Sequence, residues 1–354
     1  MMTYIISGFL IITNFISALL KGKGSILKIL LLTFMWVLFW GSNDNADYLN
    51  YKQLYDYISY TGAGFSTSQF GFVQIMKFAT KLGLQYHHFL MIISLIGIYM
   101  ITETVKKYTD KPHLVYTLYF IHPFLLDIVQ VKHFLAMAII VYCFRYLEQD
   151  GNKNNIKFIA GILIATSIHL ISIIFLPLLF IKKMSIRKLV LLVASILIVG
   201  IPIAYSDVLQ FIALNILGIQ RIETYFLNRA RFGFFIQFFI QGTIFLMVLL
   251  SRKILTKRRE CNKFIDLIYR TNLYLIVLFP LYIINGTFER GFRMIMILNY
   301  ILISKLFSTS KKREKIVILV FIFIFAFSLF MYYTFIPYKG TVFFPIFENN
   351  LIFN

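Results

Sequence analysis

The stretch IKFIAGILIATSIHLISIIFLPLLFI, residues 156–181, decides how this chain is organised. It is long and apolar enough to cross a bilayer once, but Lys153 precedes it closely and Lys182 and Lys183 follow it. Basic residues concentrate on the cytoplasmic side of membrane proteins. A full crossing would therefore place one of these two basic clusters outside, against that bias.

A re-entrant hairpin removes the conflict, because both ends of the stretch then lie on the cytoplasmic side. Two arms of about 12 residues, rising 1.5 Å per residue, would each reach only ~18 Å into the membrane. The turn then falls near residues 166–169 and opens outward. Non-helical backbone at that depth is tolerated only inside protein or beside a wet cavity, so we expect a cavity there. An ordinary span in a chain that breaks the charge rule once is the alternative.

The composition indicates that the whole chain is a membrane protein. Of its 354 residues, 59% are hydrophobic and 14% are charged, and the mean hydropathy is +0.79. Soluble domains carry about 25% charged residues. We therefore predict an all-α, polytopic membrane protein forming one integral membrane domain over 1–354, with outer loops at 42–85, which includes an amphipathic segment, and at 206–233. Ten apolar runs predict transmembrane helices near 3–20, 25–41, 86–105, 114–131, 133–147, 188–205, 234–251, 267–284, 292–307 and 316–336.

The net charge of +20 has a membrane explanation. Most basic residues form short clusters between apolar runs, where orientation signals and contacts with anionic membrane lipids belong. This distribution argues against a nucleic-acid partner. Cys143 lies in an apolar run and Cys261 in a basic loop, so neither a disulfide framework nor a cysteine metal site is expected.

The first outer loop combines carboxylates with aromatic residues. Asp44 and Asp47 precede a segment rich in tyrosine, which includes Tyr48 and Tyr51. Carboxylates that accept hydroxyl protons and rings that stack on pyranose faces suit a saccharide. A tyrosine belt at the membrane interface is the alternative. The three-residue step from Asp44 to Asp47 does not match a metal-binding DxD motif, so no metal is predicted.

Two features inside the apolar sequence carry ionisable groups. Lys132 and His133 lie between two short spans and are candidates to hold an anion, although Lys132 could instead reach headgroup phosphate. His169 is isolated at the expected hairpin turn. An ionisable residue within a membrane segment favours a functional role, whereas an interhelical hydrogen bond is the alternative.

Arginines gather on the predicted outer side in two segments. Guanidinium groups bind phosphate oxygens through bidentate, charge-assisted hydrogen bonds and keep their charge at low dielectric. These arginines predict a pyrophosphate or polyanionic ligand, with lipid headgroups as the alternative. The candidates are Arg229 and Arg231 in the second outer loop, and Arg290 and Arg293 further on.

The sequence resembles the EpsG family, within the wider class of Wzy-type polysaccharide polymerases. The resemblance lies in DNADYLNY (44–51), VKHFLAMAI (131–139), ATSIHLISIIFLPL (165–178), RIETYF (221–226) and ERGFRM (289–294). The family typically has an Arg-Gln pair where this chain has Lys132 and His133. Lysine keeps the charge but loses the bidentate fork.

The resemblance implies a GT-C-like glycosyltransferase in the bacterial inner (plasma) membrane. Such an enzyme joins undecaprenyl-pyrophosphate-linked oligosaccharide repeat units on the outer face, without a cofactor and with a chain-length regulator protein as a partner. Departure of the pyrophosphate would be stabilised by the four arginines together with Lys132 and His133. The base for the acceptor hydroxyl would be His169, Asp44 or Asp47. A flippase or transporter of lipid-linked oligosaccharide and a membrane acyltransferase are the competing functions.

Overall fold

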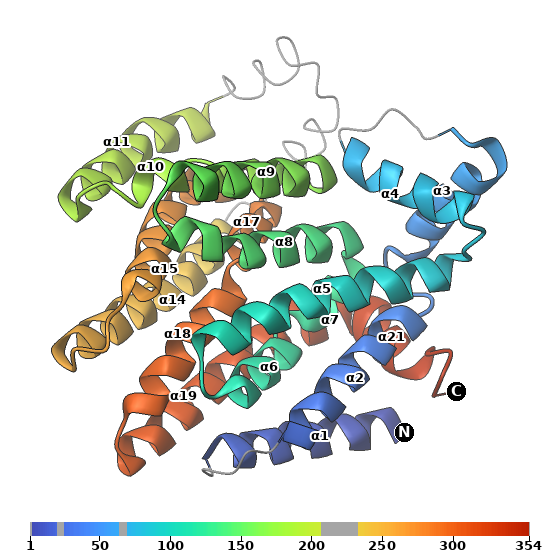
Figure 1. The fold of residues 1–354 in the computed structure, drawn as a ribbon, viewed down its shortest axis with the longest axis horizontal. Coiled ribbons are helices and arrows are strands. Elements are labelled where there is room, and N and C mark those ends of the chain that lie inside the picture. Colours follow the sequence, from blue (N-terminus) through green and yellow to red (C-terminus); the bar gives the residue numbers. More distant parts are fainter. Residues whose placement is uncertain (1, 20–24, 64–68, 207–232, 354) are drawn as a thin grey trace. The chain divides into compact units, whose positions relative to one another are not determined.

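The structure is a computed structural model that describes residues 2–19, 25–63, 69–206 and 233–353. Within these ranges the ordered elements are helices and none is a strand, which confirms the predicted all-α class (Figure 1). An isolated β-bridge joins Ser42 to Asn350. The outer loop predicted at 206–233, with Arg229 and Arg231, lies almost wholly outside the described residues.

The chain divides into two compact units. The first comprises 1–146, 156–173 and 296–354, and the second comprises 147–155 and 174–295. The helices of the first unit are α1 (Met2–Leu19), α2 (Ser25–Gly41), α3 (Tyr48–Thr61), α4 (Phe70–Lys81), α5 (Tyr86–Tyr108), α6 (Pro112–Ile121), α7 (Phe124–Val129), α8 (Val131–Glu148), α9 (Asn152–Ile168), η1 (Leu170–Phe175), α18 (Met296–Thr309), α19 (Lys312–Phe330), η5 (Met331–Phe335), α20 (Ile336–Tyr338), η6 (Lys339–Phe343) and α21 (Phe344–Glu348). Three of these helices, α8, α9 and η1, each extend a few residues into the second unit.

The first unit is built around α6. Nearly every residue of α6 is buried, as expected for a helix that is apolar all round, and it packs against α1, α2 and α18. Glycine allows a close approach nearby, because a Cβ at Gly97 on α5 would lie 2.3 Å from the Phe134 ring on α8. Short breaks at His122–Pro123 and at Gln130 separate α6, α7 and α8. Residues 112–148 are thus divided by two breaks into three helices.

The second unit contains longer apolar helices. α11 (Ile186–Tyr205) packs against α16 (Phe279–Ile284), and α14 (Gly233–Lys257) packs against α15 (Lys263–Tyr274). The Tyr282 hydroxyl donates to Gln241 Oε1, and Gln241 Nε2 donates to the Leu275 carbonyl at 2.9 Å. The remaining elements are α10 (Leu178–Ile181), η3 (Leu275–Leu278), η4 (Gly286–Phe288) and α17 (Glu289–Arg293).

Several helices have the length and composition of membrane spans. Within the described residues, six pass by both criteria, and a seventh is possible if Gly286–Arg293 and Met296–Thr309, bent by 52°, count as one span. Large apolar side chains point outward from them, including Ile198, Phe239 and Val317, all more than half exposed. These features fit a multi-pass membrane protein. The other predicted spans correspond to short, broken or more charged helices, such as Ile26–Gly41 and the segments on either side of His122.

The stretch 156–181 folds back on its start. α9 ends at Ile168, His169 follows outside the helix, and the chain returns through η1 and α10. Lys182 Nζ then donates to Asn155 Oδ1 at 2.9 Å, so both ends of the stretch lie together, as the hairpin requires. At 17 residues, α9 is about 25 Å long, which exceeds the expected ~18 Å arm.

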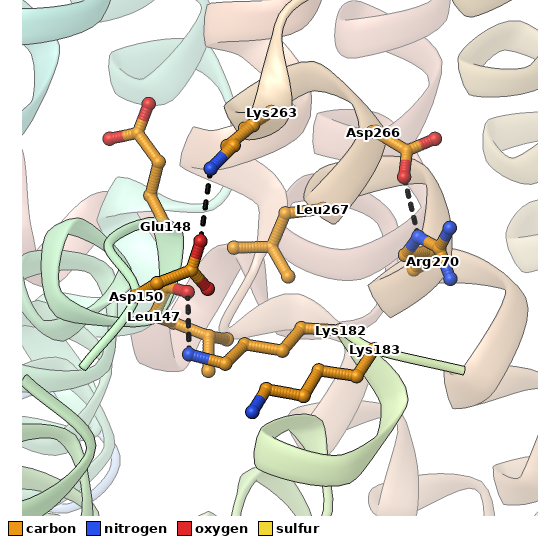
Figure 2. Close-up of a pocket in the computed structure, with 9 residues that line it drawn as sticks. All are labelled: Leu147, Glu148, Asp150, Lys182, Lys183, Lys263, Asp266, Leu267 and Arg270. Atoms are coloured by element: carbon orange, nitrogen blue, oxygen red, sulfur yellow. Dashed lines mark hydrogen bonds and ion pairs between the residues drawn. The ribbon is translucent and has the colours of Figure 1, made fainter. Parts of the chain in front are cut away.

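Charged residues hold the two ends of this hairpin together in the second unit (Figure 2). They line a cavity of about 190 Å³. Lys182 donates to the Leu147 carbonyl at 3.3 Å, and Lys263 pairs with Asp150 at 3.0 Å. Arg270 binds Asp266 and the Met184 carbonyl. Lys182, Lys263 and Arg270 thus already have partners within the protein. We therefore interpret the charged residues around the cavity as contacts that stabilise the hairpin ends, and not as a ligand site.

The surroundings of the cavity shift the pKa values of Lys182 and Asp150, two of the residues that line it. Burial lowers the pKa of Lys182, although the charge of Asp150 opposes this shift. The hydrogen bond and charge of Lys263 hold the pKa of Asp150 below its ordinary value. The lowered pKa of Asp150 keeps this carboxyl ionised at neutral pH, as the partner of Lys263.

The hairpin predicts the sidedness of its two ends. In a background without Cys143 and Cys261, cysteines at the exposed positions Lys153 and Lys183 should resist a membrane-impermeant thiol reagent applied from outside. A cysteine at Tyr60, which is 91% exposed on the predicted outer side, should react. Reaction at only one of positions 153 and 183 would make 156–181 a full crossing.

Candidate active site

Two of the predicted site residues come together in the first unit. His133 lies in the first turn of α8, and His169 lies at the turn between α9 and η1. Their ring centroids are 5.7 Å apart, with the ring planes at 83°. His133 is 1% exposed, whereas His169 is half-buried. The sequence placed these histidines in different roles, one on the anion and one as the base, but the structure makes them neighbours.

Local hydrogen bonds explain why His169 leaves the helix. Its backbone N–H still bonds to the Ala165 carbonyl at 2.8 Å and completes the last turn of α9. Its carbonyl accepts from the Ser172 N–H at 3.0 Å, a tighter three-residue pattern that begins η1. The side chain therefore projects from the junction of an α-helix and a 3₁₀-helix.

Asp127 completes the cluster and was not among the predicted site residues. Its Oδ1 lies 3.1 Å from His133 Nδ1, and its Oδ2 accepts a 2.8 Å hydrogen bond from the Tyr119 hydroxyl. Asp127 is fully buried. The sequence did contain a signal, because a carboxylate within an apolar segment is costly and usually has a specific partner.

Helices α3 and α4, within the predicted outer loop 42–85, contact this region. Lys132 Nζ lies 5.2 Å from the centroid of the Tyr51 ring on α3 and 5.4 Å from that of Phe72 on α4. Gly71 lies against the end of α9, because a Cβ there would come 2.1 Å from Ser167 Oγ. The amphipathic segment predicted within 42–85 thus lies beside the start of α8 and the turn at His169.

The carboxylates Asp44 and Asp47 have different settings. Asp44 is exposed, with φ at 54°, and Asp47 occupies the position before α3. The carboxylate that the structure places on His133 is Asp127. Among the described residues, no group of three His, Cys, Asp or Glu side chains is arranged to hold a metal ion.

The two described candidate arginines lie on α17 in the second unit. Arg293 is 3% exposed, and its Nη1 donates to Glu289 Oε1 at 3.1 Å. Arg290 is half-buried. Arg293 is therefore enclosed by protein, whereas Arg290 is more exposed and is the better candidate to reach a ligand.

Comparison with known proteins identifies the family. A model of the EpsG family matches residues 3–346. The chain belongs to the EpsG family. This family is associated with Wzy-type polysaccharide polymerases, so membership confirms the resemblance and links the chain to polysaccharide biosynthesis. No curated protein and no solved structure gives a significant match.

The EpsG match includes both compact units and every candidate residue of the site. The Tyr119–Asp127–His133 contacts and the His133–His169 pair therefore belong to the EpsG region of the chain. Chemically, this group offers two imidazoles that can take up or hold a proton and a buried carboxylate that can balance the resulting charge.

Proposed function

We propose that the chain is a polysaccharide polymerase, a glycosyltransferase of the bacterial plasma membrane. It joins undecaprenyl-pyrophosphate-linked oligosaccharide repeat units on the outer face. The observation that carries this proposal is the meeting of His133 and His169 beside α3 and α4 in a member of the EpsG family. The proposal includes ten membrane crossings, a GT-C-like arrangement, surrounding lipids and a chain-length regulator as partner.

The proposed step is a substitution at the anomeric carbon of the donor sugar. A hydroxyl of the acceptor unit attacks that carbon, a new C–O bond forms, and the C–O bond to pyrophosphate breaks. The electron pair leaves with undecaprenyl pyrophosphate, and the hydroxyl proton goes to His169. A positioned base typically contributes about 10²–10⁴-fold to such a reaction.

The charges near the histidines refine the earlier assignments. Asp127 already provides an anion beside His133, and a second anion at the same ring would be repelled. We therefore assign His133 to proton handling instead of pyrophosphate binding. Lys132, which lies over the rings of Tyr51 and Phe72, remains the candidate cation at this end of α8. The pyrophosphate role of Arg290 rests on its chemistry and its sequence context.

Deletion of the gene in its host tests the proposed function. Lipid-linked and surface glycans are separated on a gel, and a polymerase predicts single repeat units in place of long chains. Complementation with the wild-type gene should restore the long chains. Labelling intact cells with a membrane-impermeant glycan reagent separates the flippase alternative. Single units that react from outside support a polymerase, whereas units protected inside the membrane indicate a translocation defect.

A further inference from the structure

We propose that Asp127 and Tyr119 are positioning residues that fix the proton of His133 on Nδ1 and leave Nε2 as its acceptor nitrogen. The histidine pair can then take up the proton released by the acceptor hydroxyl. This kinetic role rests on the proposed function, but the protonation state of His133 does not.

The fold brings three separate helical pieces to one point. Tyr119 is on α6, Asp127 on α7 and His133 on α8, and the breaks between these helices let all three side chains meet. Each residue is at most 2% exposed. A carboxylate buried this deeply is strongly disfavoured unless its oxygens accept hydrogen bonds. Both oxygens of Asp127 do so, one from each neighbour.

For a neutral His133 beside an ionised Asp127, the donors and acceptors allow one arrangement. An ionised carboxylate only accepts hydrogen bonds, so the His133 nitrogen that faces it must carry a proton. That nitrogen is Nδ1, at 3.1 Å from Asp127 Oδ1. In a neutral imidazole the other nitrogen, Nε2, is then the acceptor. The Tyr119 hydroxyl donates to Oδ2 and holds the carboxylate in the required orientation.

Because His169 lies beside His133, the Asp127 carboxylate can affect protonation of both histidines. Its ring lies next to that of His133, so a proton taken up by the pair places positive charge close to the Asp127 carboxylate. A fixed negative group in a site of low dielectric stabilises such a charge without reorganising when it forms. Asp127 would thus act on the reaction through His133.

The first experiment measures the protonation state directly. The wild-type protein, labelled with ¹³C and ¹⁵N on histidine, is studied by NMR in lipid at neutral pH, and the His133 signals are assigned by their loss in a His133→Gln variant. We expect the neutral form with the proton on Nδ1. A neutral form with the proton on Nε2, or a ring protonated on both nitrogens, would overturn the inference.

The second experiment uses a rescue that a purely structural role would not produce. In Asp127→Asn, the Tyr119 hydroxyl should bind the amide oxygen and turn the amide nitrogen toward His133 Nδ1, which forces the proton onto Nε2. Chain elongation in vesicles with lipid-linked repeat units should then fall about 10²–10⁴-fold in kcat, with little change in KM. Adding Tyr119→Phe frees the amide to rotate and should recover about ten-fold.

The outcomes separate the two proposals. If the double variant is no more active than Asp127→Asn at equal protein level, the positioning role is wrong. If the wild-type protein elongates no chain while its His133 carries the proton on Nδ1, the proposed function fails but the assignment of His133 stands. Tyr119→Phe alone serves as the matched control and should lose less than ten-fold, because Asp127 still accepts from His133.

Discussion

Replacement of His169 by alanine should leave a folded, inserted protein that produces mostly single-unit glycans. His169 is half-buried at the end of α9, beside the ring of His133, and no other ionisable residue lies between Lys157 and Lys182. Loss of a positioned base should slow chain growth by about 10²–10⁴-fold. The measurement is glycan length on a gel at equal protein level. His88→Ala, which removes an exposed histidine from the start of α5, is the matched control.

A glutamine at this position separates two roles of His169. An amide can donate and accept hydrogen bonds, but it cannot act as a base at neutral pH. We expect His169→Gln to be as defective as His169→Ala. Substantial chain growth in the glutamine variant would reduce His169 to positioning, and the base would then be His133, Asp44 or Asp47. Normal chains in the alanine variant would remove His169 from the site.

The helical class and the hairpin could be predicted because both depend on patterns local in the sequence. Recurrent apolar runs predict helices, and the basic residues around 156–181 predict that its two ends share a side. The contact between Lys182 and Asn155 agrees with that requirement. The place of the turn also followed from sequence, because α9 ends at Ile168, within the range expected.

The pairing within the site could not be predicted in the same way. Asp127 and His133 are six residues apart, a spacing that places them on different faces of a continuous α-helix. They meet because the helix breaks at Gln130, between α7 and α8. The approach of His169 to His133 depends on packing between distant segments, which a single sequence does not display. Sequence reasoning therefore identified two of the three groups but gave His133 a different role.

The different settings of Arg290 and Arg293 also depend on contacts that the sequence alone does not display. A spacing of three residues on a helix predicts one shared face for Arg290 and Arg293. The structure has only the five-residue helix α17 there, and Glu289 lies one turn before Arg293. The ion pair between Glu289 and Arg293 is largely buried. Arg293 thus stabilises the fold through this ion pair, so mutations at positions 290 and 293 should have different effects.

Arg290→Ala should abolish most chain growth while the protein level stays normal. If its guanidinium stabilises the charge that develops on the departing pyrophosphate, removal of this single group should cost about 10²–10³-fold in rate. Arg290→Lys should recover poorly, because lysine provides the charge without the bidentate fork. Chain length on a gel and elongation rates in vesicles provide the two measurements. Arg187→Ala, at an exposed arginine at the start of α11, is the matched control and should remain active.

Arg293→Ala should behave differently, because it leaves Glu289 without its ion-pair partner in a mostly buried setting. Loss of one member of a buried pair costs about 3–5 kcal/mol, so this variant should accumulate to a lower level. Replacing Glu289 with glutamine in the same variant should restore part of that level. A normal level for Arg293→Ala would show that the pair contributes little to folding.

The Arg290→Lys variant decides the role of Arg290. If lysine at position 290 restores normal chain length, a generic positive charge is sufficient there, and bidentate recognition of pyrophosphate by Arg290 is wrong.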